Sequence, residues 1–448
     1  MVNFPTLLCL FAVANQYGWH MESMDVSQAF LHAQLMHEIY IRQPPGYRAP
    51  AGQEHWLLRL LMSLYGLKQA GFLWAQLLSA FLVEIGFRVC PYDRKVFIRR
   101  WRGTITVVPV FVDDMIAMGN SRAEIERTKA LLGARFKVKN LGEVEAFLGM
   151  RIRRDKVAGV MTIDLEGYTR KLLDEYGMTN ARPASLPNVG SAHDILPPAT
   201  EKERVELEGP ARELIGKLQF LANRTRADLI ISVSFAARLM PNASISLMVY
   251  LKGILRYLAG TAGDGLIFRR QAARPRLVTT ADGDYAMDKN DRKSQIAYVT
   301  RLGDATISVG SKKTKTVVKS TMEAETHALA YGCADLIYFS RFLKDLGLPS
   351  AGLPLLVGDN QAALELAQHP CNFEATKHIE VQYYFAREQW EKGAIELDWT
   401  PTAENSADML TKNLPRPAFN RFRAMLGIGD TVQGSVGLGT ARPGNGAL

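Results

Sequence analysis

The amino-acid sequence predicts a multidomain protein that combines α/β and α+β architecture. Apolar runs rich in β-branched residues, typical of buried strands, alternate along the chain with segments whose apolar residues recur at helical spacing. The 448 residues are enough for two to four domains. Hydrophobic residues make up 47% of the chain and charged residues 22%, a composition typical of a globular protein that buries several cores.

The first elements are predicted to be a helix, a strand and a second helix. Segment 5–14 is apolar, has no Lys or Arg before it and is too short to span a membrane, so it is interpreted as an internal helix. Residues 19–26 alternate as a strand does, and Asp25 stands at the end of this strand. Between 69 and 85 the apolar residues keep helical spacing, which predicts a helix that packs mainly into the core.

Two adjacent carboxylates interrupt the apolar segment from Ile105 to Met118. The pattern predicts a strand, a tight turn and a returning strand, with Asp113 and Asp114 at the tip of the hairpin. Neighbouring carboxylates between buried strands repel each other unless they are exposed, protonated or neutralised by a cation. A Mg²⁺ ion, which favours one or two protein carboxylates, suits this position. A solvated Asp-Asp turn is the alternative.

Three segments, in the order of the family's motifs, resemble the reverse transcriptase of copia-type retrotransposons: Met24-Asp-Val-Ser-Gln-Ala-Phe30, Ser63-Leu-Tyr-Gly-Leu-Lys-Gln-Ala70 and Phe111-Val-Asp-Asp114. The resemblance implies a right-hand polymerase palm and thumb. The fingers are expected to be largely missing, because the chain begins after the segment that supplies them in the family, so the polymerase is interpreted as N-terminally truncated. The resemblance also implies that Asp25, Asp113 and Asp114 are catalytic and hold two Mg²⁺ ions, with Mn²⁺ as a substitute.

The same resemblance assigns an incoming-nucleotide pocket to the turn before helix 69–85. A glycine at position 66 lets the backbone approach a ligand, and Lys68 near a helix start attracts phosphate. Phe30 resembles the bulky ring beneath the nucleotide sugar that selects against ribonucleotides. An ordinary glycine turn and a core aromatic ring are the alternatives. The predicted nucleotide-binding residues are Phe30, Tyr65, Gly66 and Lys68.

The middle of the chain is predicted to be helical. Residues 168–178 and 211–240 keep helical spacing with interleaved Arg and Lys, which suits contact with a duplex backbone, although a solvated basic face is the alternative. Segment 269–275 is basic, lacks apolar periodicity and suits a hinge. The predicted domains are a palm with partial fingers at 1–165, a helical thumb or connection at 166–268, a linker at 269–276, a second α/β domain at 277–427 and a disordered glycine-rich tail at 428–448.

In the second α/β domain, acidic residues stand where predicted elements begin or end. Asp282 and Asp359 each close a strand, Glu323 opens a long helix at 322–346, and Asp408 lies in the first turn of a later helix. The sequences around these residues resemble the ribonuclease H domain of the same elements. The resemblance implies a ribonuclease H-like fold in which these four carboxylates are catalytic and hold two Mg²⁺ ions to cleave the RNA strand of a hybrid.

Three alternatives remain open for these carboxylates. Asp359 can instead cap the helix that follows it. Asp408 can instead complete a capping box with Asn405. Glu325 rather than Glu323 can face the site, because residues two apart on a helix lie on opposite sides; alignment with the family motif favours Glu323.

A basic stretch, Gly310-Ser-Lys-Lys-Thr-Lys-Thr-Val-Val-Lys319, precedes the long helix and matches a basic stretch of the family. It is expected to meet the backbone of the hybrid. The predicted nucleic-acid-binding residues are Lys312, Lys313, Lys315 and Lys319.

The composition of the chain limits the kinds of partner and compartment that are expected. A net charge of +9 and a pI near 9.3 suit a polyanionic partner, and four scattered cysteines indicate a reducing compartment with neither a disulfide framework nor a zinc site. The leading hypothesis is an RNA-directed DNA polymerase with ribonuclease H activity from a retrotransposon polyprotein. Its expected partners are an RNA template, a DNA primer, an RNA–DNA hybrid and dNTPs, in the cytoplasm or nucleus and without a membrane. The alternatives are a silent nucleic-acid-binding remnant and a chain in which ribonuclease H alone is active.

Overall fold

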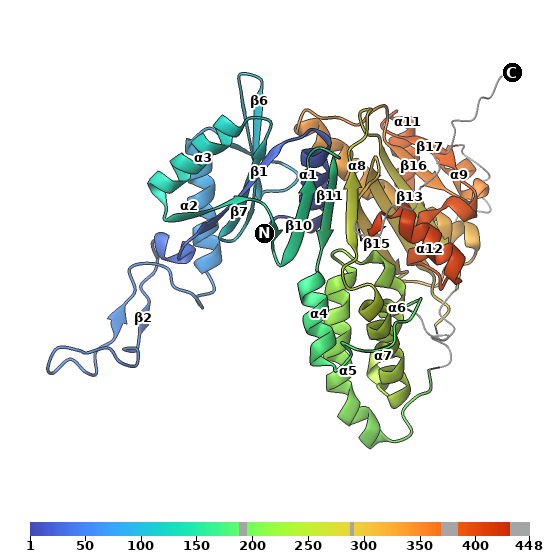
Figure 1. Cartoon of the computed structure of the whole chain (residues 1–448), viewed down its shortest axis with the longest axis horizontal. Coiled ribbons are helices and arrows are strands. Elements are labelled where there is room, and N and C mark those ends of the chain that lie inside the picture. The colour runs from blue at the N-terminus through green and yellow to red at the C-terminus, as the bar shows by residue number, and fades with distance from the viewer. Residues whose placement is uncertain (188–194, 287–290, 369–383, 431–448) are drawn as a thin grey trace. The chain divides into compact units, whose positions relative to one another are not determined.

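A computed structural model of the chain describes residues 1–187, 195–286, 291–368 and 384–430 (Figure 1). The chain forms two compact units. One comprises Met1–Phe147 with Arg341–Pro349, and the other comprises Leu148–Ser340 with Ser350–Leu448.

The first unit contains a six-stranded sheet in the order β4-β5-β6-β7-β1-β8. All of its ladders are antiparallel. The predicted strand 19–26 and the predicted hairpin are both confirmed, the latter as β6 and β7. The strands are β1 (His20–Val26), β4 (Arg88–Val89), β5 (Val96–Trp101), β6 (Thr104–Phe111), β7 (Asp114–Gly119) and β8 (Val138–Glu143). A separate pair, β2 (Tyr40–Ile41) and β3 (Leu58–Arg59), forms a two-stranded ribbon.

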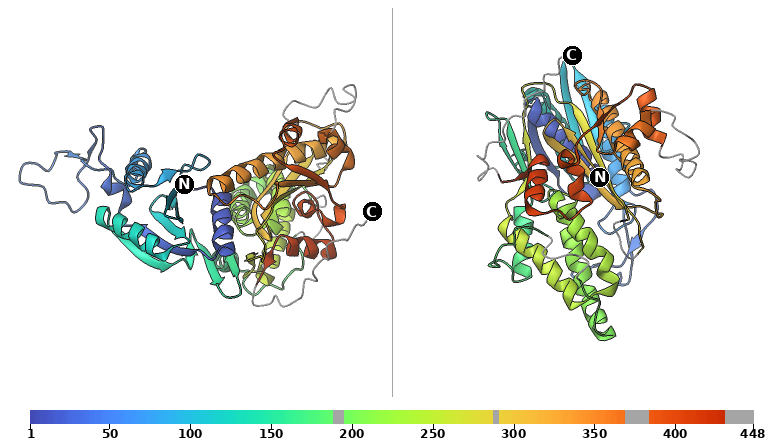
Figure 2. Two further views of the ribbon diagram at one scale, coloured as in Figure 1. Left: turned by 90° about the horizontal axis from the view of Figure 1, so that it is seen from above. Right: turned by 90° about the vertical axis from the view of Figure 1, so that its right-hand side faces the viewer.

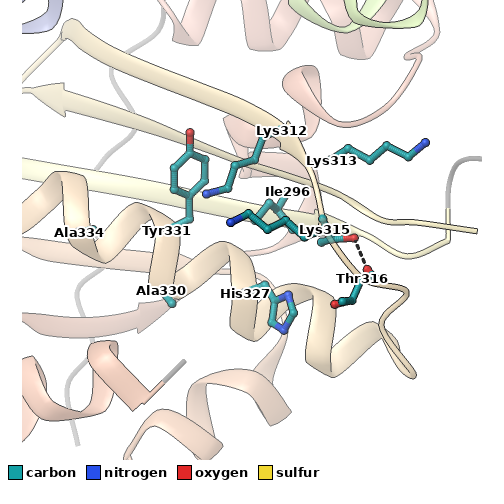
Figure 3. A pocket seen from close by; sticks show the side chains of 10 residues that line it. Ile296, Lys312, Lys313, Lys315, Thr316, His327, Ala330, Tyr331 and Ala334 are labelled. Atoms are coloured by element: carbon teal, nitrogen blue, oxygen red, sulfur yellow. Dashed lines mark hydrogen bonds between the residues drawn. The ribbon is translucent and has the colours of Figure 1, made fainter. Parts of the chain in front are cut away.

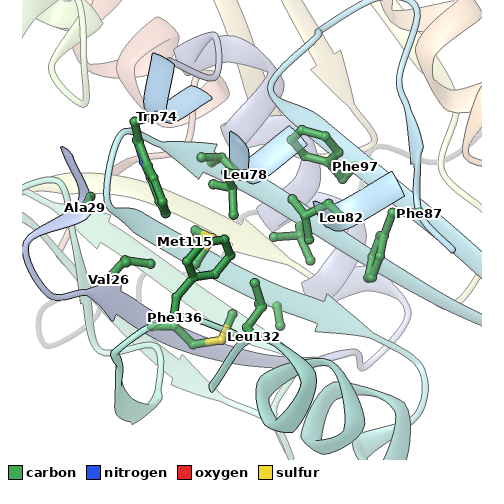
Figure 4. Packing of buried hydrophobic residues seen from close by; sticks show 14 of the residues in the cluster. Val26, Ala29, Trp74, Leu78, Leu82, Phe87, Phe97, Met115, Leu132 and Phe136 are labelled. Carbon is green, nitrogen blue, oxygen red and sulfur yellow. The ribbon is translucent and has the colours of Figure 1, made fainter. Parts of the chain in front are cut away.

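Three helices accompany this sheet: α1 (Phe4–Gln16), α2 (Ala70–Glu84) and α3 (Arg122–Arg135). The predictions of an internal helix at 5–14 and of a core helix at 69–85 are confirmed, since ten consecutive residues of α1 are buried and α2 contributes Trp74, Leu78 and Leu82 to the core. Figure 4 shows these side chains meeting Met115 of β7 and Phe136. The rings of Trp74 and Phe136 pack edge to face, with centroids 5.2 Å apart.

In the second unit, a long hairpin and a set of helices come first. Within this unit the hairpin strands join a sheet in the order β18-β12-β11-β10, and the helices that follow pack on one another. Figure 2 shows the helices side by side. The strands of this unit are β10 (Met150–Asp155), β11 (Val160–Asp164), β12 (Gly265–Arg269) and β18 (Ile428–Gly429), and the helices are α4 (Glu166–Glu175), α5 (Glu201–Ala222), α6 (Ile230–Leu239) and α7 (Ile245–Gly260). The short strand β9 (Ala146–Phe147) is the last strand of the first unit.

The second unit also contains a mixed five-stranded sheet in the order β15-β14-β13-β16-β17. β13, β14 and β15 are antiparallel neighbours, whereas β16 and β17 run parallel to β13. The elements are β13 (Leu277–Asp284), β14 (Gln295–Leu302), β15 (Ala305–Lys313), β16 (Leu355–Gly358), β17 (Glu396–Trp399), α8 (Thr321–Asp345), α9 (Gln361–Gln368), α11 (Phe385–Glu391), the 3₁₀ helix η7 (Ser406–Leu410) and α12 (Arg416–Met425). The strands and helices predicted beyond residue 277 are therefore confirmed.

Helix α8 and the 3₁₀ helix η7 cover opposite faces of this sheet. A Cβ at Gly332 of α8 would lie 3.0 Å from Thr279, whereas the hydroxyl of the next residue, Thr280, lies 3.1 Å from that of Ser406 in η7. Because successive residues of a strand point to opposite faces, β13 is sandwiched between the two helices.

Two of the predicted domain boundaries were wrong. The predicted palm ran to residue 165, but β10 and β11 belong to the second unit because β11 pairs with β12 across an intervening hundred residues. The predicted linker 269–276 does not separate two units: β12 ends at Arg269 inside a sheet, and β13 begins at Leu277 within the same unit.

A buried polar network joins the helices to the end of the second unit. The guanidinium of Arg226 donates two hydrogen bonds to Asp228, of 2.9 and 2.8 Å, and one of 2.8 Å to the carbonyl of Thr261. Tyr257 of α7 and Arg423 of α12 both donate to the same Asp228 carboxylate, at 2.6 and 3.3 Å. Breaking such a pair leaves an unpaired buried charge, so the network stabilises the packing of α12 against these helices.

Among the described residues, no helix combines the length and apolarity that crossing a membrane would require. Cys9, Cys90 and Cys333 are buried free thiols; the fourth cysteine, Cys371, lies outside the described residues. The predicted disordered tail begins differently, because Ile428 and Gly429 form β18 and pair with β12. Residues 431–448 of that tail lie outside the described residues.

Candidate functional site

Three carboxylates gather at one end of the six-stranded sheet, and we call Asp25, Asp113 and Asp114 the hairpin cluster. Asp25 of β1 lies directly opposite Asp114 of β7, and Asp113 lies in the two-residue turn between β6 and β7. The backbone N–H of Val26 donates to the carbonyl of Asp113 at 3.1 Å, which ties the turn to β1. The structure therefore brings these three predicted site residues together.

The carboxylates of the hairpin cluster act on the pKa of one of their members. Burial raises the pKa of Asp114 above its ordinary value, and the negative charges of Asp113 and Asp25 raise it further. A bound cation would reverse this effect, because an opposite charge favours the ionised carboxylate.

The turn that carries Asp113 has a strained backbone, and a hydrogen bond from a buried side chain holds it. Val112 has a φ of 61°, a left-handed conformation that is rare for a β-branched residue. The buried indole of Trp74 donates a 2.7 Å hydrogen bond to the carbonyl of Val112. Strained conformations of this kind persist where the surrounding structure holds them, and they cluster at functional sites. The sequence predicted Trp74 only as a core residue, since no local signal links positions 74 and 112.

Two predicted nucleotide-binding residues lie in contact. The rings of Phe30 and Tyr65 have centroids 4.6 Å apart. An isolated bridge between Gln34 and Met62 draws the two loops together. Gly66 and Lys68 are both exposed, and Gly66 has a φ of 95°, which favours glycine. Nucleotide binding by these residues stays a prediction.

A second set of carboxylates meets at the ends of β13 and β16 beside α8. Among the described residues, one group of three offers ligand oxygens that all lie within 4.8 Å of one another: Asp282, Glu325 and Asp359. Asp408 lies beside Asp282, because the ammonium of Lys412 lies 3.1 Å from a carboxylate oxygen of Asp282 and 3.0 Å from one of Asp408. Burial and then the negative charge of Asp282 raise the pKa of Asp408. We call these four carboxylates the sheet-end cluster.

The choice of Glu323 for this cluster was wrong, and Glu325 takes its place. A Cβ at Gly283 would lie 2.6 Å from the backbone of Ala324, so only glycine lets β13 approach α8 this closely. At this approach the N–H of Gly283 donates a 3.1 Å hydrogen bond to Oε2 of Glu325. Glu323 instead completes a capping box: its carboxylate accepts from the N–H of Lys319 at 2.6 Å, and its own N–H donates to Oγ of Ser320 at 3.1 Å.

Asp282 is fully buried and is held by two residues that the sequence analysis did not single out. The hydroxyl of Thr411 donates to its Oδ2, and the ammonium of Lys412 lies 3.1 Å from its Oδ1. The same ammonium lies 3.0 Å from Oδ1 of Asp408. The spacing of four residues between Asp408 and Lys412 was the one sequence signal for this pair.

The donor set of the sheet-end cluster fits a hard divalent cation. Burial raises the pKa of Glu325, and the charges of Asp282 and Asp359 raise it further. Burial likewise raises the pKa of Asp284, at the end of β13, to about 6. Oδ1 of Asp359 is buried and has no hydrogen-bond partner among the described residues. Lys412 places one positive charge beside Asp282 and Asp408, and converging carboxylate oxygens are the ligands that Mg²⁺ or Mn²⁺ prefers.

The two capping alternatives are answered by neighbouring asparagines. Asn360, not Asp359, caps α9 by accepting from the N–H of Ala363 at 3.0 Å. Asn405 caps η7 by accepting from the N–H of Ala407 at 3.1 Å. Its own N–H donates to the carbonyl of Thr402 at 3.2 Å, so Asp408 does not complete a capping box with it. Both predicted aspartates are therefore left for the cluster.

The four predicted nucleic-acid-binding lysines do not share one environment. The ammonium of Lys312 lies 3.5 Å from the ring centroid of Tyr331, and that of Lys313 lies 2.8 Å from Asp291. Lys315 and Lys319 are exposed. Their binding role stays a prediction.

The chain is similar to reverse transcriptases and to transposon polyproteins. The model of the family described as reverse transcriptase (RNA-dependent DNA polymerase) matches residues 1–190. The retrovirus-related Pol polyprotein from transposon TNT 1-94 of Nicotiana tabacum is 32% identical over 96% of this chain and 32% of its own length. The corresponding polyprotein from transposon RE2 of Arabidopsis thaliana is 32% identical over 96% of this chain and 29% of its own length.

A third relative is matched over almost its whole length. A putative transposon Ty5-1 protein of Saccharomyces cerevisiae is 28% identical over 66% of this chain and 94% of its own length. The solved N-terminal RNase H domain of a Mycobacterium tuberculosis protein matches 34% of this chain and 97% of its own, at 19% identity and a TM-score of 0.22. The chain spans about a third of the length of the two plant polyproteins.

Proposed function

We propose that this chain, which belongs to the reverse transcriptase (RNA-dependent DNA polymerase) family and matches the Pol polyproteins of copia-type retrotransposons, carries two phosphoryl-transfer centres. The hairpin cluster is the centre of an RNA-directed DNA polymerase, which takes an RNA template, a DNA primer and dNTPs. The sheet-end cluster is the centre of a ribonuclease H, which cleaves the RNA strand of an RNA–DNA hybrid.

The observation that carries this proposal is the convergence of Asp282, Glu325 and Asp359 within 4.8 Å from two strand ends and a helix. The first and last of these residues are 77 positions apart, and separate contacts hold Glu325 and Asp282 in place. The N–H of Gly283 holds Glu325, and Thr411 with Lys412 holds Asp282. A set of buried like charges held in this way is costly unless a cation and its substrate use it.

Each cluster is proposed to hold two Mg²⁺ ions. When bound, the ions supply activation of the attacking oxygen and neutralisation of charge on the leaving group. The chain's own residues orient the carboxylates before binding. At the hairpin cluster, Trp74 fixes the turn through Val112, so Asp113 keeps its position relative to Asp25.

Hybrid cleavage without polymerisation is a second candidate, and one observation favours it. Among the described residues, the group of three carboxylates within 4.8 Å lies in the sheet-end cluster, and the hairpin cluster forms no group of that compactness. A chain that cleaves hybrids but extends no primer would fit this difference.

A single purified preparation separates the two candidates. The protein is given a primed RNA template with dNTPs and MgCl₂, and DNA extension and RNA cleavage are followed separately. Asp113→Asn is expected to lower extension by at least about 100-fold and to leave cleavage intact, and Asp359→Asn is expected to do the reverse, because each removes a ligand that the metal chemistry needs.

The outcomes distinguish the candidates. Cleavage that depends on Asp359, without any extension, selects the second candidate. Activities that persist in both variants would overturn the assignment of both clusters.

A further inference from the structure

Lys412 lies inside the sheet-end cluster. Its ammonium lies 3.1 Å from Oδ1 of Asp282 and 3.0 Å from Oδ1 of Asp408. Asp282 also converges with Glu325 and Asp359, and among the described residues neither of those two forms an ion pair. Asp282 is therefore shared by two sets of oxygens, and the set that includes Asp408 binds an ammonium group.

The local backbone places this ammonium. The N–H of Lys412 donates a 3.0 Å hydrogen bond to the carbonyl of Asp408, and residues four apart in a helical turn lie on one face. The hydroxyl of Thr411 donates to the other oxygen of Asp282, Oδ2. Asp282 is therefore held by Thr411 even when the side chain of Lys412 moves away.

The side chain of Lys412 is free to leave the cluster, whereas Asp282 is not. Lys412 is 32% exposed, and the side chain of Asp282 is fully buried. A lysine ammonium is a compact charge on a flexible four-carbon stem. It can therefore turn back to water without any change in the backbone.

An ammonium and a divalent cation compete for the place between Asp282 and Asp408. Both are attracted by the same two carboxylates, and positive charges a few ångströms apart repel each other. Lys412 must therefore leave before a divalent ion binds Asp408. It need not leave for an ion beside Glu325 and Asp359.

The lysines of the basic stretch before α8 do not take this place. Figure 3 shows the side chain of Lys312 beside Tyr331 of α8, and its ammonium lies 3.5 Å from the centroid of that ring. His327 lines the same cavity and follows Glu325 by two residues, so Lys312 meets α8 on a different side from the cluster. Among the described residues, the ion pairs of the cluster are those of Lys412.

We propose that Lys412 is a resident cation of the sheet-end cluster, which occupies the position of the second divalent ion and must be displaced before that ion binds. The inference rests on the proposed two-metal hybrid cleavage and deepens it. It gives the two ions an order, the first beside Glu325 and Asp359 and the second beside Asp408. Lys412 is a positioning residue that acts through Asp282 and Asp408, and it sets the concentration of divalent cation that the second position requires.

The first test counts the ions that the full chain binds. Every protein carries Asp113→Asn and Asp114→Asn, which remove two of the three carboxylates of the hairpin cluster, and this chain is called the parent. Metal-free protein is titrated with MnCl₂ in a calorimeter. The parent is expected to bind one ion tightly and a second at least about tenfold more weakly, because the second competes with a unit charge. Lys412→Met removes that charge and should tighten the second ion by at least about tenfold.

Two variants separate the charge of Lys412 from other effects. Lys412→Arg keeps a positive charge that hydrogen-bonds to carboxylates, so the second ion should bind no more tightly than in the parent. Lys392→Met is the matched control, because Lys392 forms an exposed i, i+4 ion pair with Glu388 away from the cluster. It removes the same charge and should bind both ions as the parent does.

Thermal unfolding supplies a readout that does not depend on counting ions. In EDTA, Lys412→Met leaves Asp282 and Asp408 without their ion-pair partner, so it should unfold at a lower temperature than the parent. MnCl₂ should raise its unfolding temperature by more than that of the parent. A Lys412→Met protein that is unfolded in EDTA and folds in MnCl₂ would support the inference equally. One that MnCl₂ stabilises no more than the parent would overturn it.

Failure of the inference and failure of the proposed function give different results. If the parent binds two ions with equal affinity and Lys412→Met binds them alike, Lys412 is not a resident cation and the metal centre stands. If neither protein binds an ion, or if Asp359→Asn leaves the titration unchanged, the sheet-end cluster is not a metal centre. The inference then falls together with the proposed function.

Discussion

Glu325 and Glu323 stand two residues apart on α8, and Glu→Gln at each position should have opposite consequences. Glu325→Gln removes one carboxylate from the sheet-end cluster. Divalent-cation binding is expected to weaken by at least 10- to 100-fold, the range that the loss of an outer partner of a metal ligand already causes. The Gln carbonyl can still accept the hydrogen bond from Gly283, so the helix keeps its place.

Without metal, the same substitution should not destabilise the protein. Burial and then the charges of Asp282 and Asp359 raise the pKa of Glu325. A raised pKa means that the folded state disfavours the ionised form of the carboxyl group. Such a group stabilises the folded state less and less as the pH rises above the ordinary pKa of a carboxyl group. At pH 7 the metal-free variant is therefore expected to unfold at the same temperature as the wild type or above it.

Glu323→Gln is the matched control. Gln still accepts the hydrogen bond from the N–H of Lys319, which is the bond of the capping box. The loss of a negative charge in the first turn of α8 costs about 0.3–1 kcal/mol. Cation affinity should be unchanged, since Glu323 is not among the converging ligands.

The assay is calorimetric titration of each metal-free protein with MnCl₂ and MgCl₂, beside thermal unfolding in EDTA. The expected pattern is a loss of cation affinity without a loss of stability for Glu325→Gln, and the reverse for Glu323→Gln. An equal loss of affinity in both variants, or a loss in Glu323→Gln alone, would refute the placement of Glu325 in the cluster.

Three further predictions follow from the structure. Gly283→Ala places a Cβ 2.6 Å from the backbone of α8, so it should cost about 1–3 kcal/mol in urea unfolding and lower hybrid cleavage; a neutral result in both would contradict the close approach. Burial alone would raise the pKa of Asp228, but Arg226 lowers it to about 2; Asp228→Asn should thus cost about 3–5 kcal/mol at pH 7 and less as the pH falls from about 4 toward 2, checked by urea unfolding at each pH. Trp74→Phe removes the hydrogen bond to Val112, so it should cost about 1–3 kcal/mol and lower primer extension while hybrid cleavage is unchanged, as parallel assays would show.

Sequence reasoning reached the hairpin cluster almost completely. Asp25 stands near the end of strand 19–26, and the hairpin tip carries Asp113 and Asp114, so each carboxylate could be placed near the end of an element from local pattern alone. The pairing of β1 with β7, which sets Asp25 opposite Asp114, is a contact between segments ninety residues apart. No local pattern specifies such a register, although the family resemblance implied its result.

The errors lie where packing between distant segments decides the outcome. Glu323 and Glu325 both lie in the first turns of α8 and cannot be separated by helical periodicity. The close approach permitted by Gly283 selects Glu325. The domain boundaries failed for the same reason, since the pairing of β11 with β12 and the burial of Arg226 and Asp228 against α12 were not visible in segment 166–276.

The sequence by itself determined which elements form, in what order, and which acidic residues stand at their ends, because strand and helix periods and turn residues act over a few neighbouring positions. It also indicated the reverse transcriptase family, whose model matches residues 1–190, through motifs whose spacing is a property of the chain alone. Only the tertiary structure decided that Glu325 meets Asp282, that Lys412 bridges Asp282 and Asp408, and that the helices after β11 share a body with the mixed sheet. These outcomes depend on which face of a helix packs against which strand, and that choice is made by long-range burial rather than by local pattern.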